Sequence, residues 1–280
     1  MNELIVNNEV TIRLLAFFGI LLLVAGLEAV FPRRRLRLSR WLRWRGNLGL
    51  VLLNTLVIRL LFPAALVGLA LFVNEQGWGI FNYYQLPFIL AVIASVIILD
   101  FVIYLQHVMV HAVPLFWRVH RVHHADLDYD VTTGSRFHPL EIILSMLIKF
   151  AAVLVLGPPV VGVIIFEVLL NGLAMFNHGN LRLPLGLDKV LRLFIVTPDM
   201  HRVHHSVHDN ETNSNFGFNL SIWDRLFGTY IPQPRDGHEQ MQIGIHGFED
   251  QKQVAGLGGM LLIPFKGKVG EYAINQRNWD

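Results

Sequence analysis

The chain has 280 residues, of which 53% are hydrophobic and 16% are charged, and it carries a formal net charge of +2 at pH 7. Because soluble domains average about 25% charged residues, this deficit indicates that lipid is part of the solvent, and the modest charge does not favour a nucleic-acid binder. The chain has no cysteine, which excludes disulfides and any haem-thiolate, iron–sulfur or cysteine-zinc site formed by its own side chains.

Apolar runs along the chain predict an all-α integral membrane protein with about five transmembrane or hairpin helices. A helix needs about 20 apolar residues to cross a hydrocarbon core of about 30 Å, and each of the first three runs has that length. Glu3 and Glu9 predict that the first run is a membrane span and not a cleaved signal. The last two runs are separated by Gly157-Pro158-Pro159 and predict a helical hairpin. The five runs are residues 12–31, 48–73, 86–106, 139–156 and 160–177.

The charge of the connecting segments predicts how these helices are oriented. Residues 32–47 contain seven Arg, whereas residues 74–85 contain Glu75 and no Lys or Arg. Positive charge is biased toward cytoplasmic loops, so the first segment is predicted inside, and the second segment and the N-terminus outside. Every histidine cluster then falls on the cytoplasmic side of a membrane that we expect to be a bacterial inner membrane. A nucleic-acid arm is the competing interpretation of the Arg run, but its position between two apolar runs favours the membrane.

Nine of the 13 histidines form four groups along the chain. The groups are an HxxxH motif, an HxxHH motif, a single histidine after the predicted hairpin and a second HxxHH motif. Helical residues three or four positions apart share one face, so each motif directs its imidazoles together. One first-row metal takes about four to six ligands, so this number of imidazoles indicates two ions. The predicted ligands are His107, His111, His120, His123, His124, His178, His201, His204 and His205.

The residue types around these histidines narrow the chemistry. The zinc-protease pattern HExxH is absent, and so are the paired Glu and ExxH motifs of soluble di-iron bundles. This leaves a site whose ligands are nearly all nitrogen, and a redox-active metal pair in such a site could bind dioxygen. Activated oxygen beside a membrane points to a lipid C–H bond as its target.

The order and spacing of the three histidine motifs resemble those of the fatty acid hydroxylase/sterol desaturase superfamily. The resemblance extends to the residues around the second and third motifs, to a short HPxE segment between them and to the sequence after the last motif. The context of His178 and of residues 223–229 is most similar to the bacterial sterol-desaturase-like branch and to alkylglycerol monooxygenases. The similar segments are residues 117–124, 136–141, 197–205, 211–217 and 223–229.

The resemblance implies a catalytic region at residues 95–232, between an N-terminal transmembrane region at residues 1–94 and a C-terminal cytoplasmic or interfacial tail at residues 233–280. It implies two iron ions held by the eight motif histidines, with His178 as a ninth ligand, and dioxygen as co-substrate. The reaction would be hydroxylation, desaturation or ether cleavage of a membrane lipid. Electrons are predicted to come from a separate donor protein, because the chain has neither a dinucleotide-binding Gly pattern nor a haem-binding HPGG stretch.

Four further residues are candidates for supporting the ligands. Asp100 and Tyr104 precede His107 in an apolar run, where an Asp costs about 2.5–3.5 kcal/mol at a helix centre. The Asp100 carboxylate is predicted to accept a hydrogen bond either from the second N–H of a ligand imidazole or from the Tyr104 hydroxyl. His138 could be a ligand, a group that orients a ligand or a helix start, and Asp199 could orient a ligand or be solvated. Further candidates for the role of Asp199 are Asp209, Glu211 and Asp224.

Three further histidines lie outside the motifs and are predicted to be surface imidazoles. They are His208, His238 and His246.

Two other classes of function remain as alternatives. A metal transporter would place its ligands near the bilayer midplane on broken helices, which the helix-end positions of the motifs disfavour. An inactive relative that only binds lipid is the third possibility. Neither the lipid substrate nor the oligomeric state follows from the sequence.

Overall fold

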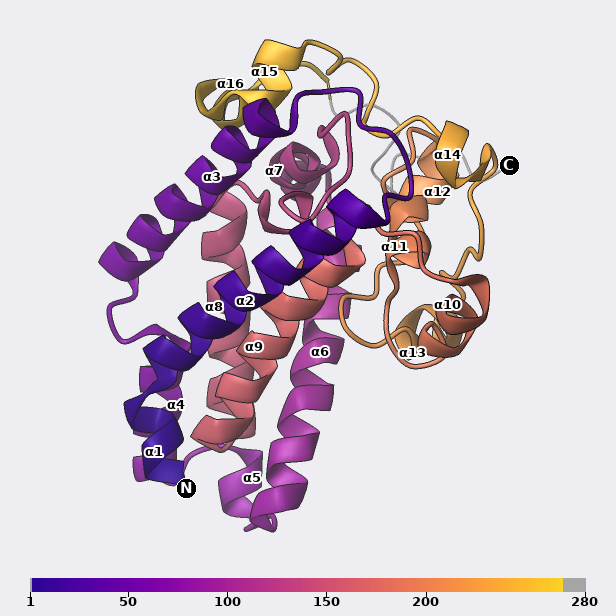
Figure 1. Cartoon of the computed structure of the whole chain (residues 1–280). Helices are drawn as coiled ribbons and strands as arrows, with labels where there is room; N and C mark the ends of the chain where they lie inside the picture. Colours follow the sequence, from indigo (N-terminus) through magenta and orange to yellow (C-terminus); the bar gives the residue numbers. More distant parts are fainter. Residues whose placement is uncertain (1, 269–280) are drawn as a thin grey trace.

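The long helices of the computed structural model form a bundle, and most of the short helices gather at the end away from the N-terminus (Figure 1). The structure describes residues 2–268, and within that range it contains helices, turns and three isolated bridges but no strand. The predicted all-α membrane fold is confirmed, since five segments are long and apolar enough to cross a membrane. The long helices are α2 (Glu9–Val30), α3 (Arg40–Leu61), α4 (Ala65–Glu75), α6 (Phe88–Ala112), α8 (Pro139–Leu156) and α9 (Val160–Asn177).

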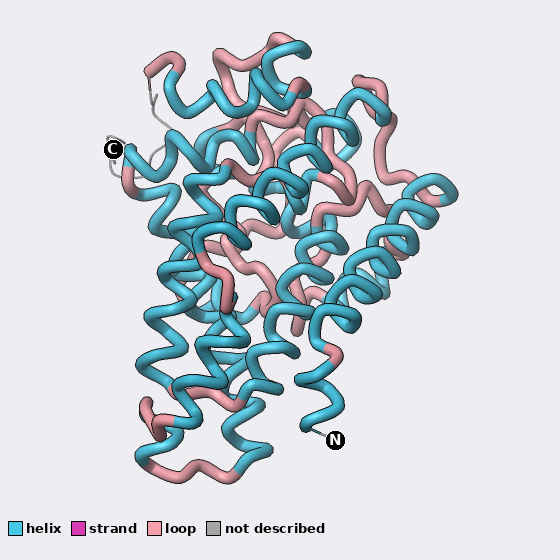
Figure 2. Tube along the Cα trace, turned by 90° about the vertical axis from the view of Figure 1, so that its left-hand side faces the viewer, coloured by secondary structure: helices cyan, strands magenta, loops and turns pink. Residues whose placement is uncertain are grey.

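Shorter helices connect the long ones and build the end of the bundle that carries the histidines. Figure 2 shows the loops concentrated toward that same end. The short helices are α1 (Asn2–Asn7), α5 (Ile80–Tyr83), α7 (Pro114–His124), η1 (Thr133–Ser135), α10 (Leu185–Leu191), α11 (Pro198–His204), α12 (Asp209–Thr212), α13 (Ile222–Leu226), α14 (Gly237–Gln240), α15 (Gln251–Ala255), α16 (Leu257–Leu262) and η2 (Ile263–Phe265).

The second predicted span differs from its expected form. The sequence predicts one continuous span at residues 48–73, but the structure divides it at Pro63 into α3 and α4. Proline lacks a backbone N–H and its ring clashes with the preceding turn, so a helix usually ends before it. The structure also begins α3 at Arg40, so part of the predicted arginine-rich loop is helical. Figure 1 shows α3 at the outer edge of the bundle, slanted in the same direction as α2.

Apolar side chains fill the bundle between neighbouring helices. Leu66 of α4 packs with Met146 and Val153 of α8, and Leu99 of α6 packs with Phe166 of α9. On the outside of the bundle, many large apolar side chains of the long helices remain exposed, which fits contact with lipid and not with water. The chain is therefore an integral membrane protein.

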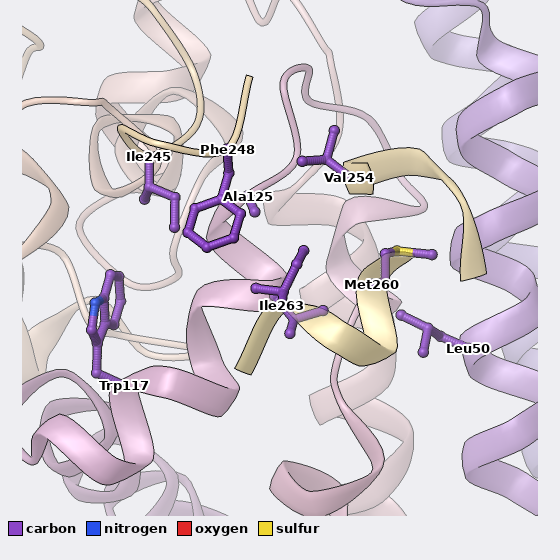
Figure 3. Close-up of a cluster of buried hydrophobic side chains, with 9 residues drawn as sticks. Leu50, Trp117, Ala125, Ile245, Phe248, Val254, Met260 and Ile263 are labelled. Carbon is purple, nitrogen blue, oxygen red and sulfur yellow. The ribbon is translucent and has the colours of Figure 1, made fainter. Parts of the chain in front are cut away.

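The C-terminal segment covers the end of the bundle that carries the histidines. Figure 3 shows Phe248, Met260 and Ile263 packed in one cluster with Trp117 of α7 and Leu50 of α3. This part of the predicted tail therefore shares a core with the predicted catalytic region. Residues 269–280 of the tail lie outside the described residues.

A buried ion network ties α3 to the loop that follows α7. The Arg43 guanidinium donates to Asp126 at 2.8 Å and also pairs with Asp130, and all three side chains are buried. Burial raises the pKa of Asp126, but Arg43 and Arg136 outweigh burial and hold that pKa at about 2. Removing one partner of a buried ion pair costs about 3–5 kcal/mol. Arg43 therefore has a structural role that its assignment to a loop did not predict.

Glu28 connects the end of α2 to two segments that follow the histidine-bearing helices. Its Oε1 atom accepts the backbone N–H of Val131 and that of Asn180, each at 2.7 Å. Val131 lies in the loop after α7, and Asn180 lies two residues after His178. One buried carboxylate thus holds the segments beside the second histidine motif and beside His178 against a membrane helix.

Candidate metal centre

The nine predicted ligands come together in two adjacent groups. Within each group the ligand nitrogens lie within 4.8 Å of one another, and every one of these side chains is buried. The first group draws on α6, α7 and α11, and the second on α7, α11 and the end of α9. The first group is His107, His111, His120, His124 and His204. The second group is His123, His178, His201 and His205.

Proline begins both of the short helices that carry the HxxHH motifs. Pro114 and Pro198 stand at the first positions of α7 and α11. Proline is favoured there because its fixed φ suits a helix and its missing N–H would be unpaired in any residue. The Thr197 hydroxyl also caps α11 by accepting the N–H of Met200 at 3.3 Å. Both helices therefore start at a defined residue, which sets the direction of each imidazole.

Neighbouring histidines of each HxxHH motif belong to different groups. His120 and His124, four residues apart, join the first group, whereas His123 joins the second. In the last motif the first and third histidines join the second group, and the middle one joins the first. Successive helical residues point about 100° apart, so a helix that passes between the two groups contributes to both.

Acceptors from one short segment orient three rings of the first group. The Nδ1 atoms of His107 and His204 each lie 2.7 Å from a backbone oxygen of residues 213–216. The Nδ1 atom of His111 lies 3.0 Å from the side-chain oxygen of Asn213 in the same segment. An acceptor at Nδ1 places the ring proton there and leaves the lone pair of Nε2 free to bind a metal.

The Nε2 atoms of the second group converge on one another. His178 Nε2 lies 3.1 Å from the Nε2 atoms of His123 and His201. It lies 3.2 Å from that of His205. The Nδ1 atom of His178 already faces the backbone oxygen of Ala174 at 2.7 Å, so the one proton of a neutral ring is held there. The lone pair of His178 Nε2 therefore faces three further ring nitrogens, an arrangement that suits a cation bound among the four imidazoles.

Buried nitrogens without hydrogen-bond partners indicate that the first group also suits a metal ion. The Nε2 atoms of His107, His111 and His204 are buried and have no partner among the described residues. Leaving a buried polar atom unpaired costs about 1–3 kcal/mol, and coordination to a metal removes that cost. Burial, followed by the neighbouring imidazoles, lowers the pKa of His123 and His124 well below the ordinary value. Both rings are therefore neutral, which is the form that binds a metal.

Comparison with known families identifies the region that contains both groups. Residues 92–229 match the fatty acid hydroxylase family, and all nine histidines lie within this stretch. The chain contains a fatty acid hydroxylase domain. Histidine groups that can hold a metal are the chemical basis expected of such a domain.

Several known proteins are similar to this chain. Ornithine lipid hydroxylase OlsE of Rhizobium tropici is 30% identical over 184 residues, which cover 66% of this chain and 53% of that protein. Alkylglycerol monooxygenase of Xenopus tropicalis is 34% identical over 135 residues, covering 48% and 29%. Fatty acid hydroxylase vlmA of Lecanicillium is 31% identical over 147 residues, covering 48% and 40%. The chain thus spans about half or less of these relatives, and no solved structure matches it.

Asp100 has different hydrogen-bond partners from those predicted. Its carboxylate accepts the backbone N–H groups of Asn219 at 3.3 Å and Leu220 at 3.1 Å. It also accepts the indole N–H of Trp223 at 2.9 Å. Neither a ligand imidazole nor the Tyr104 hydroxyl is among these partners. Asp100 therefore holds the segment before α13 against α6 and does not orient a ligand directly.

Tyr104 reaches a ligand through a chain of hydrogen bonds. Its hydroxyl lies 3.0 Å from Thr229 Oγ1, which donates to Asp224 at 2.7 Å. The Asp224 carboxylate also accepts the backbone N–H of Phe216 at 2.7 Å, and burial raises the pKa of this carboxyl to about 6. The backbone oxygen of Phe216 is the acceptor for His107. Tyr104 and Asp224 thus position the residue that orients a ligand.

His138 begins α8 and lies in neither histidine group. Its Nδ1 atom accepts the backbone N–H of Leu140 at 3.2 Å. Its Nε2 atom lies 3.4 Å from the backbone oxygen of Leu261. Of the three roles considered for this residue, its contacts match the helix start.

Asp199 lies in an ion network on the outer side of α11. Its carboxylate accepts the Arg33 Nε–H at 3.2 Å and also pairs with Arg202 in the next turn. The Arg202 guanidinium donates to the backbone oxygen of Gly179 at 3.1 Å. Asp199 therefore connects α11 to the arginine-rich segment, and its hydrogen bonds in the described structure do not include a ligand imidazole.

The prediction that His238 is a surface imidazole is wrong. Its relative exposure is 4%, and its Nε2 atom lies 3.6 Å from Asp199. Burial lowers the pKa of His238 to about 3, against the attraction of Asp199. His208 is partly exposed and lies 2.8 Å from Asp236, and His246 is exposed. No local pattern marks the buried residue among these three.

Glu141 is a site residue that the sequence prediction did not single out. Its Oε1 atom lies 2.6 Å from His120 Nδ1, and its side chain is buried. A carboxylate at this atom fixes the tautomer of a metal-binding imidazole and raises the basicity of its ring. The available signal was the HPxE segment, in which this Glu stands three residues after His138.

Proposed function

We propose that the chain is a di-iron lipid monooxygenase that hydroxylates a C–H bond of a membrane lipid with dioxygen. The observation that carries the proposal is the pair of buried imidazole groups at one end of a membrane bundle, each with ligand nitrogens within 4.8 Å of one another. Relatives named as an ornithine lipid hydroxylase, an alkylglycerol monooxygenase and a fatty acid hydroxylase support a lipid as the substrate.

Iron is the metal that we propose for both groups. Imidazole suits iron and zinc alike, but zinc has no redox chemistry and cannot serve an oxygenase in this way. When bound, the two irons would supply the activation of dioxygen, which amino-acid side chains cannot provide. The second group would hold one ion through its four imidazoles, and the first group would hold the other.

The protein's own side chains orient the ligands and keep water away from them. Glu141 and residues 213–216 hold ring protons on Nδ1, so the Nε2 atoms face inward. Phe137 stacks on His123 with ring centroids 4.6 Å apart, and the buried Trp117 lies 4.8 Å from His111. The proposed reaction converts a C–H bond, dioxygen, two electrons and two protons into an alcohol and water.

A separate protein is proposed as the electron donor, and the histidine end of the bundle is proposed to face the cytoplasm. The arginine-rich segment lies at the histidine end of the bundle, and the bias of Arg toward cytoplasmic loops supports this orientation. Hydroxylation is proposed ahead of desaturation because the relatives are named as hydroxylases and monooxygenases. Metal transport is less well supported, since the ligands form a buried cluster at one end of the helices.

Oxygen incorporation tests the proposal directly. Purified protein is loaded with ferrous iron without oxygen and then given a chemical reductant, a membrane lipid extract and isotopically labelled dioxygen. We expect two irons per chain and a lipid product that contains one labelled oxygen atom. A lipid product that has lost two hydrogens and gained no oxygen would identify a desaturase. Iron-loaded, reduced protein that leaves every lipid unchanged would contradict the proposal.

A further inference from the structure

Eight large apolar side chains gather on the surface formed by α10, α13 and the residues just after these helices. Their relative exposures range from 46% to 72%. We call this surface the apolar platform. An exposed apolar area of this kind marks contact with a membrane or a partner. The apolar platform consists of Leu185, Leu187, Val190, Leu193, Phe194, Ile222, Leu226 and Phe227.

Backbone hydrogen bonds join the two halves of the apolar platform. Ile195 and Leu220 form an isolated antiparallel bridge, and the Ser221 N–H donates to the Phe194 oxygen at 3.2 Å. Figure 1 shows α10 and α13 close together on the same side of the bundle as α6. The exposed side chains of both helices therefore belong to one continuous surface.

Contacts with α6 set the depth of the apolar platform in the membrane. The Trp223 indole donates to Asp100 at 2.9 Å, and the Phe101 ring lies 4.8 Å from Trp223 and 5.7 Å from Phe227. Asp100 is the middle residue of α6, which comprises the 25 residues Phe88–Ala112. The predicted membrane span that contains it is residues 86–106, so at about 1.5 Å per residue Asp100 lies about 9 Å inside the histidine end of a hydrocarbon core about 30 Å thick. The platform thus meets α6 within the depth of the bilayer.

Asp100 supplies the hydrogen bonds that irregular backbone needs at this depth. A backbone N–H exposed to hydrocarbon is costly, so non-helical backbone is tolerated there only where the protein pairs it. The Asp100 carboxylate accepts the N–H groups of Asn219 and Leu220, which lie in the non-helical segment just before α13. An acidic residue in the middle of a membrane helix needs a function, and the support of an inserted segment provides one.

We infer that the apolar platform inserts into the leaflet on the histidine side of the membrane, with lipid acyl chains as its occupant. The platform continues the exposed apolar surface of α6, on which Ile97 and Leu105 are 42% and 47% exposed. Lys189 and Arg225, which are exposed on the same short helices, suit the phosphates of the adjoining headgroups. The depth of the platform, its continuity with the apolar surface of α6 and its positive charges all match a lipid leaflet.

The apolar platform also borders the histidine groups. The ring of Phe227 lies 5.5 Å from that of Tyr104, which lies 6.5 Å from Phe216. The Phe216 ring lies 5.5 Å from His107. Acyl chains around Phe227 are therefore separated from a histidine group by two aromatic residues. On this point the inference rests on the proposed function, because it names the leaflet from which the lipid substrate would come.

Depth-dependent fluorescence quenching tests the insertion. The chain has no cysteine, so single cysteines at Leu187, Phe194 and Leu226 can each carry an environment-sensitive fluorophore. The labelled protein is reconstituted in phosphatidylcholine–phosphatidylglycerol vesicles that contain lipids spin-labelled along the acyl chain. We expect blue-shifted emission and several-fold stronger quenching than at Glu249→Cys. Glu249 is a suitable control because it is exposed in the loop between α14 and α15.

Two results would overturn the inference. One is emission typical of water, with quenching no stronger than at Glu249→Cys. The other is weak quenching together with disulfide cross-linking between copies when the same single-cysteine variants are oxidised without the fluorophore, because a second copy would then cover the platform. The measurement needs no turnover, so its outcome is separate from that of the proposed function. Quenching without lipid oxidation would leave the insertion standing, and lipid oxidation without quenching would leave the oxygenase standing.

Discussion

The Glu141 carboxylate lies 2.6 Å from Nδ1 of His120 and so joins the first turn of α8 to the second histidine motif. Both side chains are buried, which strengthens the interaction by excluding water. The contact holds the ring proton on Nδ1 and leaves the Nε2 lone pair directed into the first group. A residue outside all three motifs thus determines how a motif histidine faces the centre.

Glu141→Gln should weaken iron binding by about 10- to 100-fold, the range typical for loss of a group that orients a metal ligand. The amide keeps the size of the side chain but is a weaker acceptor for the ring N–H. Competition with a chelator of known affinity measures the change. Glu249→Gln alters an exposed glutamate and serves as the matched control. An unchanged iron affinity would show that Glu141 acts only in packing.

His120→Ala and His204→Ala should each lose iron from the first group and abolish oxygen incorporation. Each change removes one of the five imidazoles of that group, whereas the membrane helices do not depend on them. His178→Ala tests the ninth ligand in the same way. Elemental analysis and extraction of the protein from membranes measure iron content and insertion. His246→Ala is the control, and the metal assignment fails if His120→Ala keeps two irons and full turnover.

His138→Ala should lower the free energy of unfolding by about 0.5–2 kcal/mol, the usual cost of losing an N-cap side chain. Iron should be retained, because the Nδ1 atom of His138 accepts the N–H of Leu140 and faces neither histidine group. His138→Asn keeps a capping acceptor and should recover most of the lost stability. Unfolding in detergent measures the stability of each variant, and elemental analysis measures its iron content. Loss of iron in both variants would make His138 part of the metal centre.

The buried His238 should make stability depend on pH. Its pKa is about 3 in the folded chain against an ordinary value of 6.5, so the unfolded chain binds the proton more readily. The contribution of the neutral His238 imidazole to the free energy of unfolding is therefore complete above pH 6.5, and it declines as the pH falls toward 3. His238→Gln should reduce this slope by up to about 1.4 kcal/mol per pH unit. Unfolding in detergent across this range measures it, and equal slopes in both proteins would refute the account.

Cysteine labelling in intact cells should reveal the orientation of the bundle. Ile80→Cys should react with a membrane-impermeant maleimide from outside, whereas Arg45→Cys should react only after the membrane is opened. Both side chains are exposed, so accessibility does not limit the reaction. The expectation follows from seven Arg in residues 32–47 against none in residues 74–85. The opposite labelling pattern would place the histidine end outside the cytoplasm.

Local patterns in the sequence determined much of this protein. The predicted hairpin at residues 139–156 and 160–177 coincides with α8 and α9, and Gly157 between them adopts a left-handed φ of 64°. Such elements are predictable because bilayer thickness sets the length of an apolar run and glycine tolerates positive φ. The spacing of the histidine motifs likewise follows helical periodicity, which is a local property.

Tertiary packing decided which distant residues meet. Asp100 accepts backbone N–H groups from Asn219 and Leu220, which are 119 and 120 residues further along the chain. Its role therefore could not be predicted from the apolar run in which it lies. His123 and His124 are adjacent in the chain but belong to different groups, because α7 passes between ligands from α6, α9 and α11. The burial of His238 and the contact of Glu141 with His120 depend in the same way on how separate segments pack, which no local periodicity encodes.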